Sequence, residues 1–218
     1  MTSWALIATF DSASTLRHTL DSVIKTVDMV HILDGAWKGW PSEESVSTDG
    51  TDELVRLYQD KHHDRIIYGI MHDRPTEIEA RTRLLGQCSP GDIFLVIDSD
   101  EAARGDLAAG LKRAEQSQVD CFRVAVFQPW KRGPSRAAIA HPRLFKYRKG
   151  MRYDGNHWSI VDAAGRRYDQ DTANIMLDEF ILLHRQNQRP SSYLDQRMAY
   201  NAQMRAKHWV ERSQTPRR

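Results

Sequence analysis

Apolar runs alternate with segments of helical spacing through the first half of the chain. The runs expected to form buried strands are residues 4–10, 29–33, 66–71 and 93–97. Apolar positions three or four apart predict helices between them, at residues 16–27, 54–58 and 76–85. The expected helix caps are Ser12 or Ser14, then Thr51, then the capping-box pair of Thr76 and Glu79. This alternation predicts an α/β fold with a Rossmann-like, mostly parallel central sheet flanked by helices.

The pattern changes after Gly105. We expect a helix at 107–115, a strand at 119–127, a Pro-, Gly- and Arg-rich loop at 129–137, shorter strand-like pieces at 144–147, 158–161 and 180–183, and a polar helix at 192–212. Because the sequence has no repeat, low-complexity segment or evident linker, one domain over residues 1–218 is the simplest interpretation. It divides into a regular half at 1–104 and a smaller mixed half with a C-terminal helix at 105–218.

Composition narrows the class of protein. The 218 residues are 40% apolar and carry a net charge of +2, which suits one α/β domain and not a surface built throughout for nucleic acid. The spacing of the two cysteines does not suggest zinc, so a reducing compartment is expected. We expect a cytoplasmic protein, since we find neither a secretion signal nor an apolar run long enough to cross a bilayer. The basic residues near the C-terminus predict either a solvated helix end or a contact with a polyanion: Arg205, Lys207, Arg212, Arg217 and Arg218.

Three aspartates follow predicted strands directly. Asp11, Asp34 and Asp98 each lie at or just past the carboxyl end of a strand, where parallel sheets bind their ligands. Asp100 comes one residue after Ser99, so in an extended backbone its carboxylate points to the same side as that of Asp98. Two neighbouring carboxylates favour a hard cation such as Mn²⁺ or Mg²⁺ between them. The alternative is that these acids simply follow the preference of aspartate for loops and helix starts.

The order of these motifs resembles the family 2 glycosyltransferases of the GT-A fold. The D-x-D run of the family is matched by Gly91-Asp92-Ile93-Phe94-Leu95-Val96-Ile97-Asp98-Ser99-Asp100-Glu101, and its S-T-D-G-T turn by Ser47-Thr48-Asp49-Gly50-Thr51. Looser matches cover most of the remaining chain, at residues 14–16, 21–23, 32–35, 79–81, 142–146, 156–157, 184 and 197–201. The resemblance implies a GT-A-like fold in which residues 1–104 bind a nucleotide sugar and residues 105–218 face the acceptor.

The resemblance also implies roles for single residues. Asp11 and Asp34 would contact the nucleoside, and Arg81 would neutralise the diphosphate. Asp98 would reach the ribose or the metal, Asp100 would bind the metal, and His184 would be a third metal ligand. Each of these residues also has a purely structural interpretation: a strand-end cap for Asp11 and Asp34, an acidic pair in a loop for Asp98 and Asp100, an exposed helix cation for Arg81, and a capped core residue for His184.

The implied reaction is a hexosyltransferase-like transfer from a nucleotide diphosphate sugar, UDP-sugar by resemblance, with Lewis-acid help from Mn²⁺ or Mg²⁺. An inverting reaction needs a base, for which Asp154 and His157 are the candidates, since an unperturbed histidine has a pKa of roughly 6.5. A retaining reaction needs none. Trp158 departs from the family, whose related members tend to have glutamate there. The insertion at residues 36–46, with Trp37 and Trp40, is also unusual; it forms either a lid or acceptor wall, or a surface loop.

The acceptor and the class of protein have alternatives. A saccharide, a lipid-linked glycan, a protein or modified DNA are all acceptors compatible with the sequence. A sugar nucleotidyltransferase would share the sheet, but residues 9–15 lack the glycine and lysine that a triphosphate loop needs. A non-catalytic nucleotide- or nucleic-acid-binding protein on the same fold is the other alternative, which Trp158 favours and the intact pair Asp98 and Asp100 opposes. Trp37, Trp40, Trp130 and Trp158 are candidates either for stacking on sugars or for packing.

Overall fold

A computed structural model describes residues 1–127, 139–185, 189 and 191–214, with the side chains of residues 156–158 and 204–214 left outside the description. The predicted loop at 129–137 with Trp130, and the terminal Arg217 and Arg218, fall outside the described residues. The same holds for the side chains of Arg205, Lys207 and Arg212. Within the described ranges, no helix is long and apolar enough to span a membrane.

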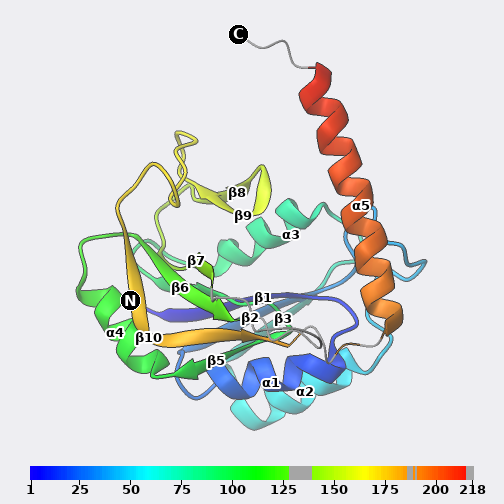
Figure 1. Ribbon diagram of the computed structural model, residues 1–218. Coiled ribbons are helices and arrows are strands. Elements are labelled where there is room, and N and C mark those ends of the chain that lie inside the picture. The colour runs from blue at the N-terminus through cyan, green and yellow to red at the C-terminus, as the bar shows by residue number, and fades with distance from the viewer. Residues whose placement is uncertain (128–138, 186–188, 190, 215–218) are drawn as a thin grey trace.

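Eight strands form one sheet in the order β3-β2-β1-β4-β7-β6-β10-β5 (Figure 1). Their bounds are β1 Ser3–Thr9, β2 Met29–Asp34, β3 Ile66–Ile70, β4 Ile93–Val96, β5 Glu101–Gly105, β6 Cys121–Phe127, β7 Ile139–Lys146 and β10 Asn174–His184. The first four strands pair in parallel, β10 is parallel to β6, and β7 and β5 pair antiparallel with their neighbours. The expected α/β fold with a mostly parallel sheet is therefore confirmed, and strands from both halves of the chain share that sheet.

Helices cover both faces of the sheet. The helices are α1 Ala13–Val23, α2 Thr51–His62, α3 Glu77–Leu84, followed by a 3₁₀ turn at Leu85–Gln87, α4 Leu107–Gln116 and α5 Ser191–Gln214. One face carries α1, α2 and α4, and the other carries α3, α5 and the hairpin of β8 Arg152–Asp154 and β9 Asn156–Val161 (Figure 1). Residues of β1 alternate between the two cores, Ala5 and Ile7 on the first face and Trp4 and Leu6 on the second. Burial on both faces explains why this strand is apolar throughout.

The helix starts match the predicted caps only in part. Thr76 and Glu79 form the expected capping box. Ser12 occupies the N-cap position of α1, but its hydroxyl donates to the carbonyl of Phe10 instead of capping the helix. Gly50, not Thr51, is the N-cap of α2, because its φ of 91° is in the left-handed region that glycine tolerates.

Two strands were not expected from the sequence. Strand β5 contains Ala102, Ala103 and Arg104, which have low strand propensity, and it forms because it pairs with β10 along the sheet edge. The short β8 pairs with β9 in a separate two-stranded sheet. The predicted run at 180–183 is the end of the longer strand β10, and the predicted C-terminal helix lies at α5, which extends beyond the rest of the fold (Figure 1).

Candidate functional site

The aspartates lie in a buried turn at the carboxyl edge of the sheet, directly after β4. Asp98, Ser99 and Asp100 are all buried, and Asp100 is only 1% exposed. Two hydrogen bonds between Asp98 and Glu101 close the turn. The Glu101 N–H donates to the Asp98 carbonyl at 2.9 Å, and the Asp98 N–H donates to the Glu101 carboxylate at 2.9 Å. The sequence therefore places two acidic side chains, with Glu101 behind them, at the edge where parallel sheets bind ligands.

Arginines from β7 and α3 face the first part of this turn. Arg81 donates to Asp98 Oδ1 at 2.8 Å and also contacts Glu77 at 3.2 Å. Arg143 lies 2.6 Å from Glu101 Oε1 and 3.5 Å from Asp98 Oδ2. Buried carboxylates persist as anions only when they are paired in this way.

The second part of the turn meets the C-terminal region. Arg189 Nε donates to Asp100 Oδ2 at 3.0 Å, and its terminal nitrogens donate to the hydroxyls of Ser12 and Ser99, each at 2.9 Å. Arg197 of α5 lies 3.7 Å from the same Asp100 oxygen, and its side chain keeps 27% exposure. A cation that reaches solvent beside the buried turn is available to an anionic ligand.

These pairings set the charge of the turn. Burial would raise the pKa of Asp98, but Arg81 and Arg143 outweigh it and hold that pKa well below its usual range. Burial likewise opposes ionisation of Asp100, and Arg189 and His184 lower its pKa in spite of it. Burial raises the pKa of Glu101, Arg143 opposes this rise, and Asp98 adds to it. The two aspartates are therefore anionic at neutral pH.

His184 ends β10 and pairs in register with Glu101, which brings its ring to the turn. Its Nε2 lies 3.2 Å from Asp100 Oδ1. Both atoms are buried, and apart from this mutual contact neither has a hydrogen-bond partner within the described part of the chain. Burial lowers the pKa of His184, but Asp100 and Glu101 raise it by more.

These two atoms decide whether a divalent ion fits the turn. A carboxylate oxygen and an imidazole nitrogen that converge without other partners suit such an ion. The described residues contain no group of three or more His, Cys, Asp or Glu side chains placed to hold a metal. An ion held by these two atoms would have to take its remaining ligands from a diphosphate and water, as Mg²⁺ commonly does. Both oxygens of Asp98 face guanidinium groups, so direct coordination by Asp98 requires those ion pairs to rearrange.

Asp34 and Asp11 lie at the ends of the neighbouring strands and share one serine. The Ser47 hydroxyl donates to Asp34 Oδ1 at 2.5 Å and accepts from the Asp11 N–H at 2.8 Å. Tyr68 donates to the other Asp34 oxygen at 3.1 Å, and the Thr48 N–H donates to Asp11. Burial raises the pKa of Asp34 to about 6, against the hydrogen bonds from Ser47 and Tyr68. Burial also raises the pKa of Asp11.

The candidate bases lie on the hairpin of β8 and β9. Asp154 is exposed at the end of β8, and the side chains of His157 and Trp158 lie outside the described part of the structure. The hairpin is fixed to α3, which carries Arg81, because the Tyr153 N–H donates to the Thr82 hydroxyl at 3.2 Å. Asp154 therefore lies on an element that is attached to the helix facing the aspartate turn.

Several residues of this site had no role in the sequence interpretation. Arg143, Arg197 and Glu101 lie in segments that resemble the family. The resemblance could have marked them as site residues, but the sequence did not indicate which side chains they contact. Arg189 lies in a polar stretch with no such signal. Its place in the site is known from its own contacts with Asp100, Ser12 and Ser99.

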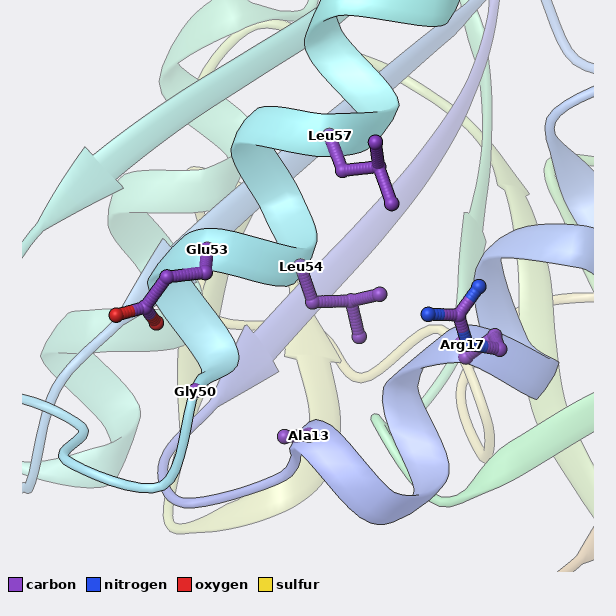
Figure 2. A pocket seen from close by; sticks show the side chains of 6 residues that line it. All are labelled: Ala13, Arg17, Gly50, Glu53, Leu54 and Leu57. Atoms are coloured by element: carbon purple, nitrogen blue, oxygen red, sulfur yellow. The ribbon is translucent and has the colours of Figure 1, made fainter.

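A surface hollow of about 310 Å³ lies beside the site but does not contain it. It opens between the first turns of α1 and α2 (Figure 2) and is lined by Ala13, Arg17, Gly50, Glu53, Leu54 and Leu57. At its rim the Ala13 N–H donates to the Asp49 carboxylate at 2.9 Å, and none of the lining residues is one of the predicted site residues.

Comparison with known proteins gives distant structural likeness only. No family model matches the sequence. No curated protein matches it either. The TarS protein of S. aureus, residues 1–349, is similar over 62% of this chain and 39% of that chain, with 18% identity and a TM-score of 0.48. The same protein with UDP-GlcNAc bound gives a TM-score of 0.47. GalNAc-T7, solved with UDP, GalNAc and Mn²⁺, is similar over 59% of this chain and 23% of that chain, with 16% identity and a TM-score of 0.48. The chain thus spans less than two thirds of the length of each of these proteins, and its activity has to be argued from its own site.

Proposed function

We propose that the chain is a glycosyltransferase that moves a sugar from a nucleoside diphosphate sugar, UDP-sugar in the first instance, to an acceptor hydroxyl. The observation that carries the proposal is the placement of three acidic positions on adjacent strands. Asp34 ends β2, Asp11 follows β1 and the turn at Asp98 follows β4, and these strands are neighbours in the order β2-β1-β4. We infer that one extended ligand contacts all three.

The nucleoside end of that ligand is assigned to Asp34 and Asp11. Above its raised pKa of about 6, Asp34 is a buried anion that accepts the imide N–H of a uracil ring. Ser47 ties this carboxylate to the backbone of Asp11, so the two acids are held at a fixed spacing. Asp11 remains partly exposed and is available to the ribose.

The diphosphate is assigned to the turn itself. Asp100 and His184 would hold Mn²⁺ or Mg²⁺, which stabilises the charge that develops on the leaving diphosphate. Arg197 adds a positive charge beside Asp100, and Arg81 holds Asp98 in place. Cations fixed before the donor binds stabilise that developing charge without reorganisation.

Acceptor activation is assigned to the hairpin of β8 and β9. If the sugar inverts, Asp154 or His157 takes the proton from the acceptor hydroxyl as the new glycosidic bond forms and the bond between the sugar and the β-phosphate breaks, which releases UDP. A retaining reaction would leave these residues without this role. The acceptor is a saccharide, a lipid-linked glycan, a protein or modified DNA.

A thermal-shift screen of nucleotide sugars with and without Mn²⁺, followed by assay of slow donor hydrolysis, tests the proposal. We expect a UDP-sugar to raise the melting temperature with Mn²⁺ and to release UDP over time. Asp106→Asn serves as a control and should respond to the nucleotide sugars as the unaltered protein does. Asp106 caps α4 by accepting from the Ala109 N–H and has no part in the proposed site. Binding without any release of UDP would support a non-catalytic nucleotide-binding protein, and absence of binding by every nucleotide sugar would contradict the proposal.

A further inference from the structure

Five aromatic rings from three distant segments pack together beside the site. Phe10 follows β1, Trp37 and Trp40 belong to the insertion at residues 36–46, and Tyr193 and Tyr200 lie on α5. Trp40 is the centre of this group, which we call the aromatic cluster. Its ring centroid lies 6.0 Å from Phe10, 5.4 Å from Trp37, 5.3 Å from Tyr193 and 5.5 Å from Tyr200.

The aromatic cluster leads directly to the aspartate turn. The guanidinium carbon of Arg189 lies 4.1 Å from the centroid of the Tyr193 ring, in cation–π geometry. The same guanidinium donates to Asp100, Ser12 and Ser99. Contacts therefore run without interruption from Trp40 through Tyr193 and Arg189 to Asp100.

The packing of Trp40 shows what kind of role it has. Trp40 is 4% exposed and its ring is surrounded by the other four, which leaves no ring face for a sugar to stack on. Its indole N–H is buried without a hydrogen-bond partner in the described part of the chain. Ring packing, and not a hydrogen bond of the indole, is therefore what Trp40 contributes to holding α5.

We propose that Trp40 is a positioning residue of the donor site, acting through Tyr193 to keep Arg189 on Asp100 and Arg197 beside it. The inference deepens the proposed function and rests on it for the effect on donor binding. The insertion thereby gains a specific role: it fixes the N-terminal half of α5, and with it two of the cations that face the turn.

The first arm of the test needs no donor. The Nε–H resonance of Arg189 in ¹⁵N NMR is assigned from its loss in Arg189→Lys. We expect it to be sharp and slowly exchanging in the unaltered protein and in Trp40→Phe, and to be lost in Trp40→Ala. Trp4→Ala is the matched control, because Trp4 is a buried tryptophan of the same core but lies at the opposite end of β1 and donates to Asp92. If Trp40→Ala does not fold, Trp40→Leu replaces it. An unchanged Arg189 resonance in the folded variant would overturn the proposal.

The second arm measures the dissociation constant for UDP with Mn²⁺. If Arg189 is docked in about one tenth of the Trp40→Ala molecules, the apparent dissociation constant rises about tenfold. Trp40→Phe should bind as the unaltered protein does, as should Trp4→Ala. Equal or tighter binding by Trp40→Ala would overturn the proposal, since tighter binding would mean that Arg189 blocks the site. If the unaltered protein does not bind UDP, the proposed function fails, and the NMR arm alone decides the role of Trp40.

Discussion

Asp100 and His184 meet at the end of the sheet with Oδ1 and Nε2 3.2 Å apart, both buried and neither hydrogen-bonded to a third group within the described residues. The two residues come from the turn after β4 and from the end of β10. Their approach depends on the antiparallel pairing of β10 with β5, which sets His184 opposite Glu101. The most specific expectations of the proposed function concern this pair.

Replacing Asp100 should strongly weaken metal-dependent donor binding. Asp100→Asn removes the carboxylate and keeps the shape of the side chain. Affinity for UDP in the presence of Mn²⁺ should fall at least about a hundredfold, because loss of a residue that merely supports a metal ligand already lowers metal affinity about 10–100-fold. Titration calorimetry measures this directly. Asp120→Asn, which loses the surface pair of Asp120 with Arg148, should bind as the unaltered protein does. Equal affinity in Asp100→Asn would remove Asp100 from the site.

Binding of uridine nucleotides should weaken as the pH falls through about 6. Asp34 has a pKa of about 6 because it is buried, and once protonated it no longer accepts an imide N–H as an anion. The UDP dissociation constant measured between pH 5 and pH 8 should rise at the acid end, and Asp34→Asn should bind weakly throughout. A dissociation constant that stays constant between pH 5 and pH 8 would separate Asp34 from the nucleobase.

The same carboxyl group links pH to stability. Its pKa in the folded state exceeds the ordinary aspartate value of 3.8, so the folded state holds the proton more tightly than the unfolded state does. The stabilisation by this proton is complete below pH 3.8 and is lost as the pH rises through about 6. Unfolding measured against pH should therefore show Asp34→Asn becoming relatively more stable as the pH rises through this window. A constant difference between the two proteins would disagree with the raised pKa.

Loss of Arg143 should destabilise the fold. Arg143→Met leaves the buried Glu101 and Asp98 without one of their cations, and breaking a buried pair in this way costs about 3–5 kcal/mol. Denaturant unfolding measures the change. Arg148→Met, which breaks an exposed pair with Asp120, should cost about 0–1 kcal/mol. Equal costs for the two variants would show that the buried pair adds nothing.

Gly35 should not tolerate a side chain. Its φ is 150°, and a Cβ placed there would lie 2.7 Å from the Met71 carbonyl oxygen and 3.0 Å from that of Ser45. Gly35→Ala should therefore destabilise the protein by about 1–3 kcal/mol and displace the adjacent Asp34. Gly86→Ala is the control, since no atom lies within 4 Å of a Cβ at that position. Unaltered melting of Gly35→Ala would contradict the crowding seen there.

The sequence predicts the parallel half of the sheet because the signals there are local. The predicted strands at 29–33 and 93–97 lie within one residue of β2 and β4, and the aspartates follow them as expected. Strand β5 has no such signal. Strand β5 forms because it pairs with β10, some eighty residues further along the chain. The spacing of apolar residues within a short segment cannot predict a pairing at that distance.

The arginines around the turn show a similar limit. The D-x-D spacing of Asp98 and Asp100 indicated a cation between them, and in the structure guanidinium groups supply much of that charge. Arg189 reaches Ser12 across nearly the whole chain, and this contact depends on where α5 packs. That packing depends in turn on Trp40, for which the sequence left both a lid and a surface loop open.

A crystal soaked with Mn²⁺ and UDP tests the central claim most directly. The proposed function requires the diphosphate beside Asp100 and His184, with the metal between them, and the uracil against Asp34. UDP bound elsewhere, or the two residues turned away from a site that takes neither metal nor nucleotide, would contradict it.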